Sequence, residues 1–401
     1  MRFGMITTFY PPFSYGGDAN YVRSLARALV EKGHEVEVIA STQAYLVRSK
    51  EEDDLVASTW DEGVKVHRLR HPAGLLAPLV SQQTGRPGLH GPALKAFFAE
   101  PFDVLHFHNI SLIGGPNVLK MGKAKARVMS VHDHWLTCAT HVLWKNRSRA
   151  CDRRTCFTCS IRSGIPPQLW RYTSQRDRAL ESVDRILAPS QFIADMQREN
   201  GIKTSIEVLP LFSAIEGPAE PVVAHPRRIV FAARVTALKG IEMLVRVMAA
   251  MPDIELLVIG DGELRPSLTA SCAKHPNIRF IGKVNQEELV EHYASATAVV
   301  LPTIVPENFP LTVVEAAACG TPSIVAKSSG GGAELVTATG GGLLYDGDEE
   351  LAAAIRRLVE DTALRNELGA RARSCYLARF TKEHHIAAYL RHIDEILHSN
   401  R

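Results

Sequence analysis

The 401-residue chain has no long hydrophobic run. No apolar stretch approaches the roughly 20 residues that a membrane-spanning helix needs. Met1-Arg2 leads directly into a strand-like segment, without the basic segment and apolar stretch of a secretion signal. The chain also lacks an internal repeat, a low-complexity tract and a recognised nucleic-acid-binding motif. These absences predict a cytoplasmic globular protein that binds no nucleic acid.

Short apolar segments alternate with helical stretches along the chain. The composition, 46% hydrophobic and 22% charged, suffices for two hydrophobic cores. Alternation of strands and helices favours parallel sheets with right-handed crossovers, in which ligands bind at the carboxyl ends of the strands. In the first half we predict strands at residues 2–8, 35–40, 64–69, 103–108, 127–131, 184–188 and 206–209.

Gly16 and Gly17 lie between the first predicted strand and an amphipathic helix. The helix is predicted from about Asp18 to Glu31, with Asp18 as its N-cap. A glycine pair lets the backbone approach a ligand closely, and it also suits a simple tight turn.

Two glutamates, Glu307 and Glu315, lie eight residues apart in the second half. The apolar run 298–301 predicts a buried strand before them, and a helix is predicted over 311–319, with Pro310 in its first turn. Glu307 is then in the loop and Glu315 about one turn inside the helix. A carboxylate can accept both hydrogens of a vicinal diol, and a helix N-terminus favours phosphate. The segment predicts a sugar-nucleotide site, although the spacing alone also arises by chance.

Arg234 and Lys239 follow an upstream strand that is rich in valine and alanine. Arginine offers a planar fork of donors and lysine a mobile point charge, so this loop can bind a diphosphate. Either cation alone would be an ordinary surface charge. Two further strands end at Gly260 and at Gly282-Lys283, on the same predicted edge of the sheet.

The order Arg-x4-Lys-Gly, Gly-Asp-Gly and Glu-x7-Glu resembles the retaining glycosyltransferases of family 4 over nearly the whole chain. The resemblance implies the α/β GT-B fold, with two Rossmann-like domains whose parallel sheets face each other across a cleft. Residues 1–212 would bind the acceptor and residues 213–401 the nucleotide sugar. The last helix, at about 382–397, would cross back to the first domain.

The resemblance also implies roles for individual residues. Arg234 and Lys239 correspond to the cations of the donor diphosphate, Glu307 to the carboxylate on the transferred sugar and Glu315 to that on the ribose. Further donor contacts would come from Gly16, Gly17, Phe309, Pro310 and Leu311, and the loops beside the base from Gly260, Gly282 and Lys283. The family usually has Gly-Phe-Gly where this chain has Asn308-Phe309-Pro310, which leaves open how closely the backbone approaches the sugar.

Four histidines, His106, His108, His132 and His134, cluster at two neighbouring predicted strand ends. Strand alternation puts His106 and His108 on one face but fixes no tetrahedral metal site. By its position after the strand 127–131, His132 matches the active-site histidine of the resembled family. That family is thought to react by front-face attack, in which the departing phosphate takes the acceptor proton. It needs no side-chain nucleophile, catalytic metal or other cofactor.

Four of the seven cysteines form the pattern C-x12-C-x4-C-x2-C, namely Cys138, Cys151, Cys156 and Cys159. They lie in a Cys-rich basic insertion at about 137–167, which lacks helical or strand periodicity. A cytosolic chain keeps its thiols reduced, so this spacing predicts a structural zinc site more than disulfides. Unpaired thiols and an iron–sulfur cluster are the alternatives.

Positive charge is concentrated in one stretch of the first half, which suggests an anionic partner. Residues 120–178 contain thirteen Lys or Arg against three Asp, whereas the whole chain has a net charge of +3. This stretch is either a solvated face or a surface that attracts anionic lipid or a diphosphate-linked acceptor, which would make the protein peripheral at the inner membrane face.

The predicted function is transfer of a sugar, of hexosyltransferase type, from a nucleotide diphosphate sugar to a glycan or lipid-linked acceptor in cell-surface polysaccharide or glycoconjugate assembly. Alternatives are a sugar-nucleotide epimerase or hydrolase, a non-catalytic sugar-nucleotide-binding protein, and a zinc-stabilised interaction protein. The base, the sugar and the acceptor stay open.

Overall fold

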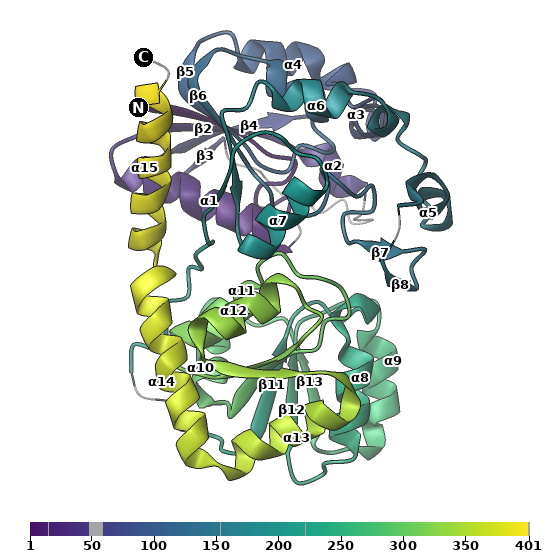
Figure 1. Cartoon of the computed structure of the whole chain (residues 1–401), viewed down its shortest axis with the longest axis vertical. Coiled ribbons are helices and arrows are strands. Elements are labelled where there is room, and N and C mark those ends of the chain that lie inside the picture. The colour runs from purple at the N-terminus through teal and green to yellow at the C-terminus, as the bar shows by residue number, and fades with distance from the viewer. Residues whose placement is uncertain (15, 48–58, 153, 221, 400–401) are drawn as a thin grey trace. The chain divides into compact units, whose positions relative to one another are not determined.

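The structure is a computed structural model of the whole chain, and it describes residues 1–14, 16–47, 59–152, 154–220 and 222–399 (Figure 1). The chain divides into two compact units. Unit 1 consists of Met1–Pro210 and Ile386–Arg401, and unit 2 of Leu211–His385.

Unit 1 is built on an eight-stranded sheet of strand order β10-β9-β6-β5-β1-β2-β4-β3. All neighbouring strands are parallel except the edge strand β3 (Trp60–Asp61), which is antiparallel to β4. All seven strands predicted in this half are present. They are β1 (Arg2–Ile6), β2 (Glu35–Ser41), β4 (Val64–Leu69), β5 (Phe102–Phe107), β6 (Ala124–Ser130), β9 (Arg185–Ala188) and β10 (Ile206–Val208).

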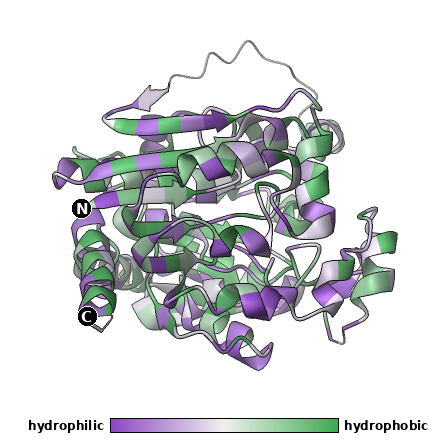
Figure 2. Ribbon diagram, turned by 90° about the horizontal axis from the view of Figure 1, so that it is seen from above, coloured by the Kyte–Doolittle hydropathy of each residue, from purple (hydrophilic) through white to green (hydrophobic). Residues whose placement is uncertain are grey.

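Helices of the structure carry both hydrophobic residues (green in Figure 2) and hydrophilic residues (purple), as expected for helices with one face on a sheet. Outside the insertion at 137–167, the helices of unit 1 are α1 (Gly16–Glu31), α2 (Thr42–Leu46), α3 (Leu76–Thr84), α4 (Gly91–Phe97), α6 (Gln175–Leu180), α7 (Gln191–Glu199) and the part of α15 (Lys382–Ser399) from Ile386 onward. Short 3-10 turns lie at Gly88–His90, Pro116–Lys120 and Leu169–Tyr172. Ile386, Tyr389, Ile393 and Ile396 of α15 are buried.

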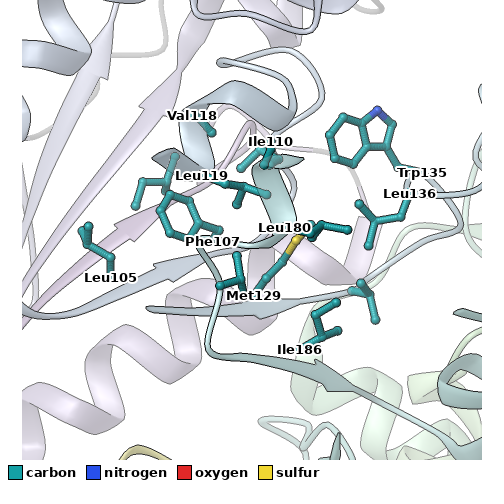
Figure 3. Close-up of a cluster of buried hydrophobic side chains, with 14 of the residues drawn as sticks. Leu105, Phe107, Ile110, Val118, Leu119, Met129, Trp135, Leu136, Leu180 and Ile186 are labelled. Atoms are coloured by element: carbon teal, nitrogen blue, oxygen red, sulfur yellow. The ribbon is translucent and has the colours of Figure 1, made fainter. Parts of the chain in front are cut away.

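The core of unit 1 lies against the central strands. Figure 3 shows Leu105 and Phe107 of β5, Met129 of β6 and Ile186 of β9 in a buried cluster. Residues from the connecting segments complete this cluster, among them Ile110, Val118, Leu119, Trp135, Leu136 and Leu180. The core therefore supports the strand ends that carry the histidines.

The insertion at 137–167 contains short elements that its sequence did not indicate. The two-residue strands β7 (Trp144–Lys145) and β8 (Arg149–Ala150) form an antiparallel hairpin, followed by helix α5 (Cys156–Arg162). Two-residue strands and a two-turn helix are too short to produce a periodic pattern, so the lack of periodicity in the sequence does not conflict with them.

Unit 2 has a six-stranded parallel sheet of order β13-β12-β11-β14-β15-β16. The strands are β11 (Arg228–Ala232), β12 (Glu255–Ile259), β13 (Ile278–Gly282), β14 (Ala298–Leu301), β15 (Ser323–Ala326) and β16 (Gly342–Tyr345). Every residue of β14 and β15 is buried, as expected for strands covered on both faces. This is the doubly wound order, and its topological switch lies between β11 and β14.

The helices of unit 2 are α8 (Ile241–Ala249), α9 (Arg265–Ser271), α10 (Gln286–Ser295), α11 (Leu311–Ala318), α12 (Gly331–Thr339), α13 (Gly347–Glu360) and α14 (Thr362–Arg379). Short 3-10 turns lie at Ala237–Lys239 and Cys272–Lys274. Among the helices of the described residues, none has the length and apolar character needed to span a bilayer.

Candidate functional site

The switch point of unit 2 brings a cation and a carboxylate together. Strands β11 and β14 are neighbours from which the chain continues to opposite sides of the sheet, so the loops that follow them meet at the carboxyl edge. Lys239 follows β11 and Glu307 follows β14. Lys239 Nζ donates a hydrogen bond to Glu307 Oε1 over 2.6 Å, and the two side chains are 22% and 16% exposed. The two predicted site residues therefore form a partly exposed ion pair.

Arg234 is exposed in the loop after β11. Backbone contacts near both ends of this loop fix its position. The N–H of Val235 donates to the carbonyl of Asp261 over 2.9 Å, which ties the loop to the turn after β12. Gly240 has a left-handed backbone with φ +69°, and an added Cβ would overlap the carbonyl oxygen of Pro302. The glycine of the Arg-x4-Lys-Gly motif is thus required by both conformation and space.

A glycine that the sequence analysis missed holds the loop of Glu307. The Glu307 N–H donates to the carbonyl of Ser329, and the Gly331 N–H donates to the carbonyl of Glu307, both over 2.8 Å. A Cβ at Gly331 would overlap the carbonyl oxygen of Asn308. The signal in the sequence was the glycine run 330–332 between a strand and a helix.

The segment that follows Glu307 differs in detail from the prediction. The Phe309 side chain is buried, with its ring 6.0 Å from that of Phe380. Pro310 is the N-cap of α11 rather than part of its first turn, because Leu311 is the first helical residue. A ligand at this helix start would meet backbone N–H groups rather than the Phe309 ring.

Glu315 lies inside α11 and already has two hydroxyl partners. Ser213 Oγ donates to Glu315 Oε1 over 3.0 Å, and Tyr293 OH donates to Oε2 over 3.2 Å. Burial raises the pKa of Glu315, and the two hydroxyls oppose this rise. Sequence reasoning missed Ser213 and Tyr293, because each is far from Glu315 in the chain.

The residues predicted beside the base lie at the ends of β12 and β13. The Gly260 N–H donates to the carbonyl of Gly282 over 2.7 Å, so the two strand ends are joined. The Lys283 side chain is exposed directly after β13.

In unit 1, helix α1 begins at Gly16 and includes Gly17 in its first turn. Asp18 was predicted to be the N-cap of this helix. In the structure it lies in the first turn instead. Burial and, to a smaller extent, the charge of Asp133 raise the pKa of the Asp18 carboxyl to about 6, although hydrogen bonds with the Ala19 backbone and the Asn109 side chain oppose the rise.

Three of the four histidines form a stacked cluster. The rings of His106 and His108 lie 3.8 Å apart between centroids, and His108 Nδ1 lies 3.0 Å from His132 Nε2. His106 is held by Ser130, whose Oγ is 2.8 Å from its Nε2, and by Tyr389 of α15, whose hydroxyl is 3.0 Å from its Nδ1.

The predicted functional histidine, His132, is neutral near pH 7. Burial lowers its pKa to about 4, and burial also lowers the pKa of His108 well below its usual value. A neutral imidazole pair can hold one hydrogen bond in which one ring donates and the other accepts, so His108 can set the tautomer of His132.

Asp133 is a second carboxylate beside this cluster. His141 Nδ1 lies 2.6 Å from Asp133 Oδ2, and the Trp135 N–H donates to Asp133 Oδ1 over 2.8 Å. Burial acts to raise the pKa of Asp133, but the His141 charge and these hydrogen bonds outweigh it and hold the pKa at about 2. Asp133 therefore stays ionised while Asp18 titrates near neutrality.

The predicted metal ligands Cys138, Cys151, Cys156 and Cys159 form no disulfide and line one cavity. Among the residues that the structure describes, no group of three or more His, Cys, Asp or Glu is arranged to hold a metal ion. This applies to the histidine cluster as well as to the four cysteines.

Two family models match the chain, one after the other. The model described as Glycosyltransferase Family 4 matches residues 15–212, and the model described as Glycosyl transferases group 1 matches residues 216–374. The chain therefore belongs to the family 4 glycosyltransferases, and it is a glycosyltransferase. The family assignment made from the motifs is confirmed.

Curated relatives match over most of the chain. An uncharacterised glycosyltransferase of Methanocaldococcus jannaschii is 28% identical over 84% of this chain and 83% of its own length. A D-inositol 3-phosphate glycosyltransferase of an Arthrobacter species is 26% identical over 88% of this chain and 84% of its own length.

Solved structures share the fold. Sucrose-phosphate synthase of Thermosynechococcus elongatus has a TM-score of 0.76 at 20% identity, over 99% of both chains. HepE of Anabaena, in complex with UDP-glucose, has a TM-score of 0.64 at 18% identity, over the whole of both chains. The predicted GT-B fold class is thereby confirmed.

Proposed function

We propose that this glycosyltransferase takes a hexose from a nucleoside diphosphate sugar and transfers it to an acceptor with retention at the anomeric carbon. The Lys239–Glu307 ion pair at the switch point of unit 2 carries the proposal. A cation and a carboxylate held 2.6 Å apart are complementary to the two ends of a sugar diphosphate, which are anionic phosphate and neutral hydroxyls.

The roles of the unit 2 residues follow from their chemistry. Arg234 and Lys239 stabilise the negative charge that develops on the departing diphosphate. Glu307 accepts hydrogen bonds from the transferred sugar. Each carboxylate oxygen of Glu315 already accepts one hydrogen bond from a hydroxyl. Each oxygen can accept a further hydrogen bond, so Glu315 can still bind the ribose diol. Phe309 and Leu311 at the start of α11 supply backbone N–H groups to phosphate, whereas Pro310 between them has no N–H.

Unit 1 contributes Gly16, Gly17 and His132 in this proposal. The bond between the anomeric carbon and the phosphate oxygen breaks, the bond to the acceptor oxygen forms on the same face, and the acceptor proton goes to the departing phosphate. Neutral His132 offers a dipole or a hydrogen bond to the sugar rather than a nucleophile.

A nucleotide donor is supported by the structural similarity to HepE, which was solved with UDP-glucose. The acceptor class is supported by the surface of α5. Phe157 and Ile161 are 48% and 56% exposed on this helix, and Arg154 and Arg162 at its two ends are also exposed. Exposed apolar and basic side chains together suit an anionic membrane, so we propose a lipid-linked or surface glycan acceptor reached by peripheral binding. We assign no role in the transfer to a metal or cofactor.

The decisive experiment begins with a thermal-shift screen of nucleoside diphosphate sugars, because a bound donor stabilises the folded state. The best donor is then incubated with candidate lipid-linked glycans, and the product anomer is determined by NMR. The proposal expects the anomeric configuration of the donor in the product. It also expects turnover about 10²–10³ lower for Arg234→Ala and Lys239→Ala. An inverted product contradicts retention, and wild-type turnover of both variants at saturating donor contradicts the diphosphate roles.

A further inference from the structure

The four cysteines of the insertion surround one small cavity. Cys138 follows the turn after Trp135, Cys151 follows the β7–β8 hairpin, and Cys156 and Cys159 lie on α5. The remaining lining residues are Ala139, Thr140, Leu143, Trp144, Lys145, Thr155 and Ser160. Four sulfur atoms, with no carboxylate and no imidazole among the lining residues, form a donor set that suits a soft ion such as Zn²⁺.

The size of the cavity matches a single ion. Its volume is about 20 Å³, and a cavity needs roughly 10–15 Å³ to hold one water-sized particle. An iron–sulfur cluster contains several iron and sulfide atoms, so it would require the walls to separate. Between these two alternatives, the volume favours one metal ion.

Two of the four sulfur atoms have hydrogen-bond partners beside the cavity. The Asn146 N–H donates to Cys159 Sγ over 3.3 Å, and Thr140 Oγ1 lies 3.2 Å from Cys138 Sγ. Lys145 lines the cavity. Four thiolates around Zn²⁺ carry a net charge of −2, which hydrogen bonds to sulfur would stabilise, whereas the ammonium group of Lys145 is already paired with Asp152 over 2.8 Å.

The backbone of the insertion is strained where the cysteines converge. Five residues other than glycine have positive φ in the described chain, and four of them, His141, Leu143, Asn146 and Arg147, lie between residues 141 and 147. Each such conformation costs on the order of 1 kcal/mol or more, and it persists only where the surroundings hold it.

The insertion has little apolar packing to hold that backbone. The main hydrophobic cluster of unit 1 includes Trp135, Leu136 and Trp170 but none of the described residues between 137 and 169. Phe157 and Ile161 of α5 point into solvent instead. Segments without a core commonly need a disulfide or a metal for stability, and none of the four cysteines is in a disulfide.

We propose that one Zn²⁺ binds Cys138, Cys151, Cys156 and Cys159 and stabilises the insertion. Binding converts the four thiols to thiolates and releases their protons to solvent. In the structure the sulfurs line the cavity without ligand geometry. Binding requires the four side chains to move into ligand geometry, with Zn–S distances of about 2.3 Å. Four protein ligands leave no open position for substrate, so the site is structural and does not depend on the proposed transfer.

The test is metal analysis of the full chain, produced without a polyhistidine tag in medium supplemented with ZnCl₂. We expect about one zinc per chain in the wild type, and less than one tenth of that in Cys151→Ser and Cys159→Ser. Cys272→Ser and Cys375→Ser are matched controls from unit 2, and they should keep the full zinc content.

A measurement on the wild type alone covers the case in which the variants fail to fold. Native zinc-loaded protein should react with a thiol reagent at no more than three cysteines, and chelation should expose Cys138, Cys151, Cys156 and Cys159 in peptide mapping. Well under half a zinc per chain with these four thiols reactive, a disulfide among them, or bound iron would each overturn the proposal. Equal zinc loss in the two controls would also overturn it.

Discussion

Replacing Glu307 by glutamine should tighten the binding of a free nucleoside diphosphate while slowing sugar transfer. In the structure, Lys239 Nζ already holds Glu307 Oε1 at 2.6 Å. A diphosphate must compete with this carboxylate for the ammonium group. Glutamine removes the competing charge and leaves Lys239 available to the phosphate, but it also removes the carboxylate that the sugar requires.

The size of the effect follows from the geometry of the ion pair. Two unit charges 2.6 Å apart attract by about 1.6 kcal/mol in a medium as polar as water. Measured exposed pairs are worth about 0.2–1 kcal/mol. Since the two side chains are only 22% and 16% exposed, we take the upper value. About 1 kcal/mol corresponds to roughly fivefold tighter binding of the diphosphate.

Isothermal titration calorimetry with the nucleoside diphosphate of the best donor measures this affinity, and steady-state turnover measures transfer. Glu350→Gln is the matched control, because it removes a carboxylate that is paired with Lys327 over 2.8 Å in the same unit. Both variants raise the net charge by one, so long-range electrostatics are equal. If Glu307→Gln binds the diphosphate no more tightly than Glu350→Gln does, Lys239 is not the cation that the diphosphate meets.

Three further predictions concern single residues. Gly331→Ala should lower donor affinity by about tenfold to a hundredfold in calorimetry, because its Cβ displaces the loop of Glu307 by roughly 1 Å; an unchanged affinity would show that this loop tolerates the shift. His132→Gln should reduce transfer without abolishing it, and wild-type turnover should show no titration of His132 near pH 6.5, because burial lowers its pKa to about 4; a rate equal to wild type would make the histidine structural. The pKa of Asp18 is raised from 3.8 to about 6 by burial, so its ionisation on going from pH 4 to 7 destabilises the folded state by at most about 3 kcal/mol. Asp18→Asn should therefore be more stable than the wild type in denaturant titrations at pH 7 and lose that advantage near pH 4, and an equal difference at both pH values would refute the shift.

The sequence predicted most strands and helices of the fold and the loops of unit 2 that follow neighbouring strand ends, because both depend on local pattern. The apolar run at β14 and the cations after β11 mark strand ends that the parallel topology brings together. Partners distant in sequence were not predictable. Tyr389 is 283 residues from His106, and Ser213 is 102 residues from Glu315. The close approach at Gly331 was also missed, since only coordinates reveal which carbonyl a Cβ would meet.

Unit 1 is formed by two separate parts of the chain, and this affects its folding during synthesis. Ile386, Tyr389, Ile393 and Ile396 of α15 are buried, and their segment belongs to unit 1 together with residues 1–210. A ribosome adds roughly 5–20 residues per second, so the 175 residues of unit 2 (211–385) separate the two parts of unit 1 by about 9–35 s of synthesis. During that interval, the side chains of unit 1 that will pack against α15 are unprotected. Residues 1–210 expressed alone would retain that apolar surface permanently.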